Sequence, residues 1–335
     1  MSRWFIYTGS GISHDRIERD LPDPPPWRVF NGGPPLPHPV WGENGDHDAT
    51  SYQSDPHAVE QVNAALFLRR PLLVTGPPGT GKSTLASAVA HELRLGPVLH
   101  WPITSRVTLS DGLYQYDPLT RLYAASREEA ASGATGDEQI GRYIRLGPLG
   151  TALLPYSRPR VLLIDEIDKS DMDLPNDLLT IFEKGYFEIP ELQRHTSLSA
   201  EVMTADGGQP VTVSEGIVRC RAFPLVIMTS NGEREFPPAF LRRCVTLRLH
   251  QPTGQKLQRI VAAHLGPDLL ADSNDIIERF LARKSSGALA TDQLLNAVYL
   301  LHHAGPEDRL KLADRLMPYL DRDVDESDPD GGIEY

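Results

Sequence analysis

This sequence has few cysteines, a shortage of basic residues and no long hydrophobic run. Its two cysteines, Cys220 and Cys244, cannot build a disulfide framework and lack metal-ligand spacing, so we expect a reducing cytoplasm and no zinc site. The chain has 33 Lys and Arg residues and 45 Asp and Glu residues, which gives a net charge of -12. Such a charge argues against non-specific binding of duplex nucleic acid, although it is compatible with a local basic pore or groove. No window approaches the roughly 20 apolar residues of a membrane span. The N-terminus has no apolar signal-peptide region. We expect a protein that is neither exported nor membrane-inserted.

The first fifty residues differ in composition from the rest of the chain. They contain the segment PDPPPWRVFNGGPPLPHPVWG, rich in proline and glycine. Proline disfavours helix and favours extended backbone, so residues 1–50 are predicted to form an arm rather than a domain. The segment contains the aromatic residues Trp27, Phe30 and Trp41, which a simple linker would lack. We therefore expect the arm to dock on a folded domain, either of its own chain or of a neighbouring one.

The remainder indicates an α/β domain followed by a helical one. Apolar runs at 71–76, 160–166 and 223–231 read as buried strands and are separated by helical patterns, beginning with Val59, Val62, Ala65 and Leu66. Buried strands alternating with helices predict a parallel sheet covered by helices on both faces. The predicted α/β domain is 51–250, and helical patterns at 256–265, 275–284 and 291–304 predict a small all-α lid domain over 251–320. The acidic residues 321–335 are predicted to be disordered.

A phosphate-binding motif follows the first buried strand. It is GxxxxGK[ST] in the strand-loop-helix context that the motif requires. Its glycines let backbone N–H groups surround phosphate oxygens, the lysine contacts the β- and γ-phosphates, and the serine hydroxyl ligates Mg²⁺. The predicted binding residues for ATP are Gly76, Pro77, Pro78, Gly79, Thr80, Gly81, Lys82, Ser83 and Thr84.

Polar residues end the next two buried strands. Asp165 and Glu166 follow LLI at the carboxyl end of a strand, where an open α/β sheet presents its ligand site. Asp165 suits a hold on Mg²⁺, with Ser83, and Glu166 suits activation of the attacking water. Asn231 follows the third strand and could help hold that water. The alternatives are a solvated strand end for the carboxylates and a turn residue for the asparagine.

Two adjacent arginines stand between a short amphipathic run and an alternating strand in FPPAFLRRCVTLRL, residues 236–249. Arg242 and Arg243 could be favourable charges at a helix C-terminus, which is the usual role of such pairs.

The order GPPGTGKS, LLIDEID, IMTSN and then an arginine before a new strand resembles the AAA+ ATPases. The phrases TSRVTLSDGLYQYD, LGPLGTALLP and FEKGYFEIPELQR look like the MoxR group within them. The resemblance covers residues 55 to about 300. It implies that Lys82 and Ser83 hold phosphate and metal, Asp165 and Glu166 serve metal and water, and Asn231 is the first sensor. The resemblance also implies an arginine finger, a residue that in this family acts on the nucleotide of the neighbouring subunit. Clamp-loader relatives read arginine-cysteine at the spot before Cys244, which makes Arg243 the better match, with Arg242 supporting the interface or solvated.

The resemblance also implies insertions and a second sensor. The stretch from Leu99 to Tyr156 is too long for a simple connection, and the related proteins carry a β-hairpin there, with EEAASGATGDEQIG as its loop tip. GYFEIPELQ and MTADGGQPVTVSEG are interpreted as further surface hairpins. A late helix of the family usually offers an arginine, where this chain has Asp292 and Gln293. Arg283 or Lys284 is a possible substitute.

Several functions are compatible with these residues. The leading hypothesis is an oligomeric Mg²⁺-ATPase, by family resemblance a hexameric ring, that remodels, assembles or switches a protein partner bearing a von Willebrand type A domain. The alternatives are a nucleotide-gated scaffold, for which the resemblance suggests a bacterial conflict system, and a McrB-like nucleic-acid motor, which the acidic composition disfavours.

Overall fold

The computed structural model describes residues 4–39, 47–123, 136–195, 198–284, 289–303 and 309–319. The chain divides into two compact units. The first contains Met1–Thr50, Ser54–Thr75 and Ser83–Arg248, and the second contains Ser51–Gln53, Gly76–Lys82 and Leu249–Tyr335. The predicted acidic tail and Trp41 lie outside the described residues. None of the helices within these ranges is long and apolar enough to cross a membrane.

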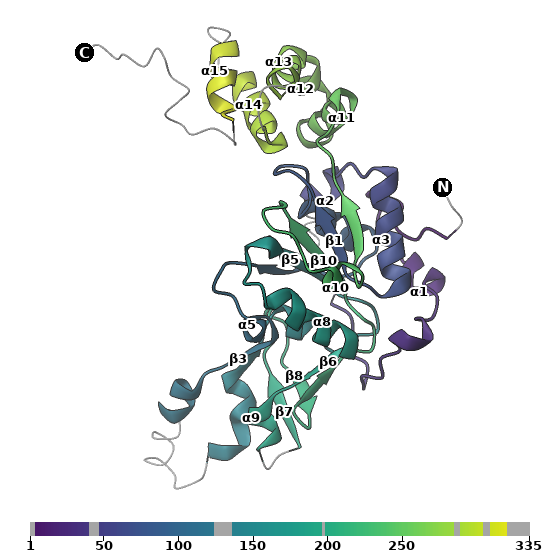
Figure 1. Ribbon diagram of the computed structural model, residues 1–335, viewed down its shortest axis with the longest axis vertical. Helices are drawn as coiled ribbons and strands as arrows, with labels where there is room; N and C mark the ends of the chain where they lie inside the picture. The colour runs from purple at the N-terminus through teal and green to yellow at the C-terminus, as the bar shows by residue number, and fades with distance from the viewer. Residues whose placement is uncertain are drawn as a thin grey trace, which may run out of the picture. The chain divides into compact units, whose positions relative to one another are not determined.

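A five-stranded parallel sheet forms the centre of the first unit (Figure 1). Its order is β11-β1-β10-β5-β2, with bounds β1 Leu72–Thr75, β2 Leu99–Pro102, β5 Val161–Asp165, β10 Leu225–Ser230 and β11 Val245–Arg248. All six residues of the central strand β10 are buried. The predicted α/β class is therefore confirmed. Strand β2 was not predicted, because only every second residue of this edge strand is buried and it lacks a continuous apolar run.

Helices of the first unit begin and end at the residues that the sequence favours. Helix α3, Pro56–Leu68, has Pro56 in its first turn, and the Asp55 carboxylate accepts the Ala58 N–H at 2.8 Å. This helix contacts β1 and β11, and helix α4, Thr84–Glu92, contacts β5. The other described helices of this unit are α1 Arg16–Asp20, α5 Leu109–Leu113, α7 Pro148–Ala152, α8 Leu174–Lys184, α9 Pro190–Gln193 and α10 Pro238–Leu241. Its 3-10 turns are η1 Pro26–Arg28, η2 Gly136–Tyr143 and η3 Ile167–Lys169. Helix α2, His47–Ser51, belongs to this unit except for Ser51, which is assigned to the second.

The described part of the N-terminal arm docks on its own subunit. The Gly32 N–H donates to the Cys220 carbonyl at 3.0 Å and the Leu36 N–H to the Pro155 carbonyl at 2.9 Å. The Phe30 ring stacks on Phe223 with centroids 5.3 Å apart. A Cβ at Gly32 would lie 2.0 Å from the Arg219 carbonyl oxygen, so only glycine allows this close approach. Residues 30–36 of the arm therefore pack on the chain's own body, and the role of the arm as a whole stays a prediction.

Two antiparallel sheets are inserted into the α/β unit. Strands β3 Tyr114–Tyr116 and β4 Ile144–Leu146 pair as the predicted hairpin. Of its predicted loop tip, residues 128–141, the part up to 135 lies outside the described residues, and 136–141 belong to the 3-10 turn η2. The second sheet has the order β6-β9-β8-β7, with β6 Tyr186–Glu188, β7 Ser199–Val202, β8 Val211–Ser214 and β9 Ile217–Arg219. Strands β7 and β8 form the second predicted hairpin.

The interpretation of GYFEIPELQ as a hairpin of its own was wrong. Its first half is strand β6, which pairs with the distant strand β9. Its second half is helix α9, which begins at Pro190. Proline removes an N–H that a strand ladder would use but suits a first helical turn, so the segment turns from strand to helix there.

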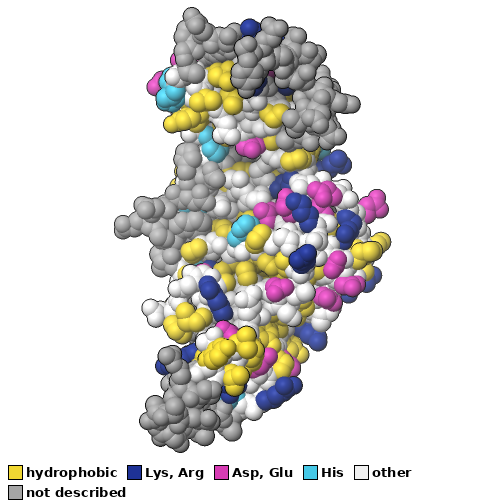
Figure 2. Space-filling view, turned by 90° about the vertical axis from the view of Figure 1, so that its left-hand side faces the viewer, with side chains coloured by type: hydrophobic (Ala, Val, Ile, Leu, Met, Phe, Trp, Pro, Cys, Tyr) yellow, Lys and Arg dark blue, Asp and Glu magenta, His cyan; other side chains and the backbone are white. Residues whose placement is uncertain are grey.

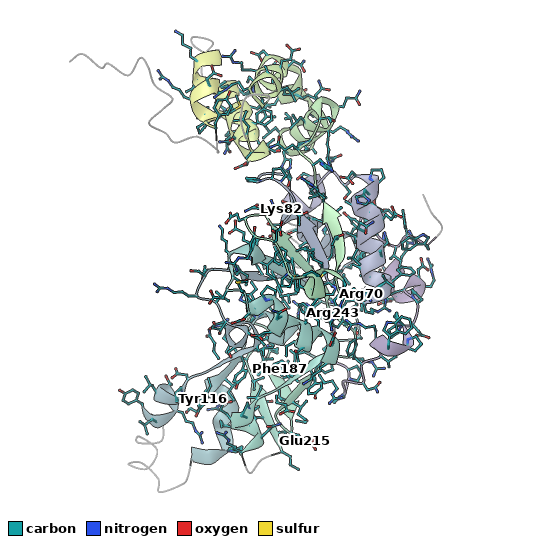
Figure 3. All side chains as sticks on the ribbon, viewed as in Figure 1. Arg70, Lys82, Tyr116, Phe187, Glu215 and Arg243 are labelled. Atoms are coloured by element: carbon teal, nitrogen blue, oxygen red, sulfur yellow. The ribbon has the colours of Figure 1, made fainter. Side chains whose placement is uncertain are left out.

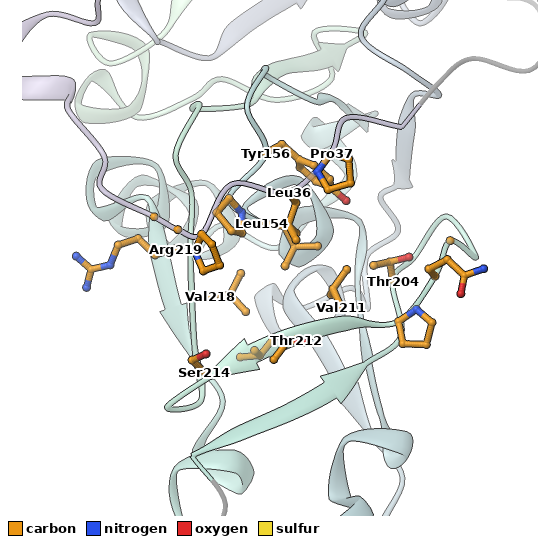
Figure 4. A pocket seen from close by; sticks show the side chains of 18 of the residues that line it. Leu36, Pro37, Leu154, Tyr156, Thr204, Val211, Thr212, Ser214, Val218 and Arg219 are labelled. Atoms are coloured by element: carbon orange, nitrogen blue, oxygen red, sulfur yellow. The ribbon is translucent and has the colours of Figure 1, made fainter.

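The arm and the four-stranded sheet enclose a pocket of about 850 Å³. Figure 4 shows Leu36 and Pro37 of the arm on one side and Val211, Thr212 and Val218 of the sheet on the other. None of the residues predicted to bind nucleotide lines it. The pocket therefore belongs to the docking of the arm and not to the predicted phosphate site.

The second unit contains the helices that follow the sheet (Figure 1). Its described helices are α11 Gly254–Leu265, α12 Pro267–Ala271, α13 Asn274–Lys284, α14 Thr291–His303 and α15 Arg309–Leu316. Leu257, Val261, Ile276, Phe280 and Leu294 are at most 1% exposed and form one apolar core. The helical character predicted after His250 is confirmed. The domain boundaries given above stay predictions, and the phosphate-binding segment Gly76–Lys82 groups with this helical unit.

Candidate nucleotide site

The lysine of the phosphate-binding loop donates hydrogen bonds to main-chain carbonyls of the same loop. Lys82 Nζ donates to the carbonyls of Gly76, at 2.8 Å, and Pro77, at 2.9 Å, and the lysine is 7% exposed. The Thr80 hydroxyl donates to the same Pro77 carbonyl at 2.9 Å. Figure 3 labels Lys82 in this loop. The ammonium group is thus held at the loop, where a phosphate would be an additional acceptor.

The glycines of this loop allow conformations and contacts that a side chain would prevent. Gly79 and Gly81 have φ values of 68° and 81°. A Cβ on Gly79 would lie 2.5 Å from the Ala290 Cβ, and one on Gly81 would lie 3.0 Å from the Tyr52 ring. Left-handed backbone and close packing both require glycine here. The glycines therefore let the loop adopt a conformation closed to other residues, of the kind in which backbone N–H groups surround a phosphate.

Asp165 is the centre of a hydrogen-bonded group at the carboxyl end of β5. The Ser83 hydroxyl donates to Asp165 Oδ1 at 2.8 Å, and the buried Thr229 hydroxyl donates to the same oxygen at 2.5 Å. His100 Nε2 lies 3.4 Å from Asp165 Oδ2. The structure thus brings together the two residues predicted to hold Mg²⁺, Ser83 and Asp165.

Glu166 has an unusual backbone. Its φ of 59° and ψ of 47° are left-handed, which costs about 1–2 kcal/mol for a residue with a Cβ. The Glu166 N–H donates to the Thr229 hydroxyl at 2.8 Å, which anchors the turn. Lys169 Nζ lies 2.7 Å from Glu166 Oε2, and this hydrogen bond raises the pKa of Lys169. The carboxylate is 42% exposed and accessible to solvent.

Asn231 is held through its backbone. Asp168 Oδ2 accepts the N–H groups of Asn231 at 2.9 Å and of Glu233 at 3.1 Å. The Asn231 side-chain amide makes no hydrogen bond to any residue in the described ranges. Asp168 therefore orients the turn after β10 and leaves that amide available.

Sequence reasoning missed the roles of Thr229, Asp168, His100 and Lys169. Asp168 and Thr229 lie inside the quoted motifs LLIDEID and IMTSN, but only the folded chain shows which atoms they contact. His100 alternates with buried residues in the unpredicted strand β2. That alternation was the available signal for its exposed position beside the sheet's carboxyl edge.

The two adjacent arginines lie elsewhere on the first unit. Arg243 pairs with the Glu183 carboxylate and donates to the Ala239 carbonyl at 3.0 Å. The Arg242 carbonyl accepts from Arg70 Nη1 at 3.1 Å. Figure 3 shows Arg70 and Arg243 near each other. Neither Arg242 nor Arg243 contacts Ser83, Asp165 or Glu166 through any bond among the described residues.

The second-sensor candidates are engaged within the helical unit. Gln293 Oε1 accepts the Ala290 N–H at 2.9 Å, which caps helix α14, and Gln293 Nε2 donates to the Pro318 carbonyl. Arg283 donates to the Asp314 carboxylate at 3.0 Å, and its guanidinium lies 4.8 Å from the centre of the Tyr319 ring. In this structure Gln293 and Arg283 therefore make hydrogen bonds that stabilise the helical unit itself. The side chain of Lys284 is outside the described part.

The residues present fit a nucleoside triphosphate with Mg²⁺. The Ser83 hydroxyl donates a hydrogen bond to the Asp165 carboxylate. Both groups are oxygen ligands, which Mg²⁺ prefers when it also binds the phosphates of a nucleotide. Among the described side chains no group of three or more His, Cys, Asp or Glu could hold a metal ion by itself. The donor set therefore suits an ion that arrives with a phosphate chain rather than an all-protein metal cage.

Comparisons with known proteins place the site in a family. A model of the AAA domain, dynein-related subfamily, matches residues 71–244, just over half of the chain. The Holliday junction branch migration complex subunit RuvB of Bifidobacterium adolescentis is 28% identical over 183 residues, 51% of this chain and 48% of that protein. RuvB of Fervidobacterium nodosum is 30% identical over 146 residues, 39% of this chain and 41% of that protein. The chain thus spans less than half the length of these curated relatives. With its P-loop, its parallel sheet and this match, the chain belongs to the AAA domain family and is an AAA+ ATPase.

Proposed function

We propose that this protein is an oligomeric, Mg²⁺-dependent ATPase of the MoxR-like branch, which couples ATP hydrolysis in the cytoplasm to the remodelling, assembly or switching of a protein partner. AAA+ ATPases bind a nucleotide, typically with Mg²⁺, and commonly form oligomeric rings. The MoxR-like phrases in the sequence support the branch, a hexameric ring and a partner with a von Willebrand type A domain. The N-terminal arm, the lid domain and the inserted hairpins are the parts available for such partners.

Each residue of the chain's own site has a distinct task in this proposal. Gly76–Ser83 and Thr84 bind the phosphates, with Lys82 exchanging its loop carbonyls for phosphate oxygens. Ser83 and Asp165 hold Mg²⁺, which when bound neutralises charge that develops on the phosphates. Glu166, on its anchored left-handed turn, takes a proton from the attacking water, and Asn231 orients that water.

The proposal that the protein acts as an oligomer rests on the position of Arg243, which precedes strand β11. All five strands are parallel, and Val245 at the start of β11 pairs with Leu72 at the start of β1. Arg243 therefore precedes the amino edge of the sheet. Val245 is level with Leu163 of β5 through Leu72 and Ile227, so Asp165 lies two residues further along the strand direction, about 7 Å, at the carboxyl edge where Ser83 contacts it. Arg243 is accordingly assigned to the nucleotide of a neighbouring copy, where a trans-acting arginine contributes on the order of 10³ to 10⁵ in rate.

A nucleic-acid motor is the second candidate. The matched relatives are subunits of a Holliday junction branch migration complex, which favours it. Against it, the face in Figure 2 shows acidic and basic side chains intermixed over the first unit, with no continuous basic band among the coloured residues, and the net charge is -12. Stimulation of ATP turnover by DNA or RNA would favour this candidate over the protein remodeller.

Mixing two inactive variants tests the trans assignment. Arg243→Ala should abolish turnover while sparing nucleotide binding, and Glu166→Gln should bind ATP without hydrolysis. Subunits of the first kind have an intact Glu166 and those of the second an intact Arg243. An equimolar mixture should therefore regain turnover, because some interfaces then contain both groups. Arg242→Ala is the matched control and should keep most of its activity.

Two results would refute the proposal. One is a mixture that assembles in ATP but stays as inactive as its components. The other is equal turnover of the wild type and Arg243→Ala. A Glu166→Gln variant that leaves the cellular phenotype intact would replace the motor with the nucleotide-gated scaffold.

A further inference from the structure

An exposed tryptophan from the arm lies at the same pocket as Arg243. The pocket has a volume of about 260 Å³ and is lined by Trp27, Arg28, Arg70, Pro71, Leu179, Phe182, Glu183 and Arg243. Trp27 is 76% exposed, although large aromatic side chains usually bury their surface. An apolar side chain of this size in water is a feature of interaction surfaces.

The exposure of Trp27 is not explained by a loose arm. Trp27 occupies the 3-10 turn η1 between prolines and Arg28. The Arg28 guanidinium donates to the Arg69 carbonyl at 2.5 and 3.1 Å and to the Phe182 carbonyl at 2.8 Å, and lies 4.5 Å from the centre of the Phe223 ring. These contacts hold the turn on the body. The indole is thus presented in a preorganised position, which lowers the entropy cost of binding through it.

The charge of the pocket indicates what covers it. Three guanidinium groups, from Arg28, Arg70 and Arg243, line it together with one carboxylate, Glu183, a local excess of two positive charges. Two of these charges are tied to the body: Arg28 to main-chain carbonyls and Arg70 to the Arg242 carbonyl. A phosphate chain brought by a partner complements such a surface.

We propose that Trp27 is a contact residue of the subunit interface, and that a second copy of this chain, with nucleotide bound, packs over Trp27 and the pocket that contains Arg243. The inference rests on the proposed function, because the copy that presents its nucleotide to Arg243 must cover this pocket. Glu183 is the partner that Arg243 leaves when the neighbouring phosphates arrive. The arm is thereby a part of the ring and not only a strap on its own body.

Turnover and assembly as functions of protein concentration test this role. Trp27→Ala, Trp27→Phe and the control Trp4→Ala would be compared with the wild type in ATP turnover per subunit. Their mass in ATP would be followed by light scattering in the hydrolysis-dead Glu166→Gln background. Trp4 is a second exposed tryptophan of the arm, 41% exposed, which packs on Phe5 and Phe67 and does not line the pocket.

Trp27→Ala should raise the concentration for half-assembly at least about tenfold, the effect of a modest aromatic anchor at an interface. At saturating concentration its turnover should equal that of the wild type, because Trp27 touches no reacting atom. Trp27→Phe should fall between them, and Trp4→Ala should match the wild type.

Two results would overturn the inference while the proposed function stands. In the first, Trp27→Ala assembles and turns over like the wild type although Arg243→Ala is inactive. In the second, Trp27→Ala is inactive at every concentration, which places its role within one subunit. A wild type whose turnover per subunit is unchanged by dilution to the monomer would overturn the trans-acting function and this inference together.

Discussion

Thr229→Val is the sharpest test of the site, because one buried hydroxyl connects the metal-binding and water-activating residues. Thr229 is 1% exposed on the central strand β10. Its hydroxyl donates to Asp165 Oδ1 at 2.5 Å and accepts the Glu166 N–H at 2.8 Å. Valine keeps the shape of the side chain and removes both hydrogen bonds. Thr229 is a positioning residue, since it acts through Asp165 and Glu166.

The size of the effect follows from these two bonds. A hydrogen bond to a carboxylate contributes about 1.5–3 kcal/mol, and a buried N–H left without a partner costs about 1–3 kcal/mol. Allowing for relaxation, the free energy of unfolding of the first unit should fall by about 2–4 kcal/mol. If about 1.4 kcal/mol of this is lost from the transition state, kcat falls about tenfold. KM for ATP should change little, because Lys82 and the loop that binds the phosphates are untouched.

Urea denaturation followed by tryptophan fluorescence and steady-state turnover measure the two effects. Thr246→Val on the edge strand β11 is the matched control, since Thr246 is exposed and its hydroxyl makes no hydrogen bond to the described residues. It should change stability by less than about 0.5 kcal/mol. If Thr229→Val keeps the stability and kcat of the wild type, the bridging role is wrong.

Three further predictions can be tested, two on the cysteines and one on the arm. Burial raises the pKa of Cys220 and of Cys244 to about 12, so both thiols should resist Ellman's reagent at pH 8 in the native protein and react after unfolding, whereas fast native reaction of either would contradict their placement. The pKa of each thiol is higher in the folded than in the unfolded protein, so the folded state is favoured while the thiol is protonated. The resulting contribution to the free energy of unfolding is complete below the unfolded pKa of about 8.5 and is lost as the pH rises from there towards 12. Urea denaturation of the wild type and of the double alanine variant across this pH range would measure the loss. Arg28→Ala should lower the free energy of unfolding by about 2–3 kcal/mol and speed proteolysis of residues 1–40, because its bonds hold the arm to Arg69 and Phe182. The control is Arg19→Ala, since Arg19 is exposed and within the described ranges pairs with its neighbour Asp20 alone. Equal proteolysis of the two variants would refute the docking role.

The catalytic half of the site was largely predictable from the sequence. The P-loop, the DEID strand and the strand before Asn231 are contiguous runs whose alternation, burial and polar ends are local properties. Ser83 and Asp165 meet as expected, since parallel strands place their carboxyl ends at one edge of the sheet. The roles assigned to individual residues stay predictions until the variants are measured.

The rest could not be predicted because it depends on contacts between residues far apart in the chain. The Thr229 hydroxyl donates a hydrogen bond to Asp165, 64 residues away in the chain. Strand β6 pairs with β9 and not with the segment that follows it, and Arg28 of the arm donates to the Phe182 carbonyl. No local pattern encodes such pairs, since many partners satisfy the same alternation or charge. The sequence by itself determined the buried strands β1, β5 and β10, the helices after His250 and the phosphate loop, because apolar runs, helical periodicity and glycine positions are local properties of the chain. Only the tertiary structure decided that Arg243 precedes the amino edge of the sheet while Asp165 is at the carboxyl edge, because that depends on the order, direction and register of the strands.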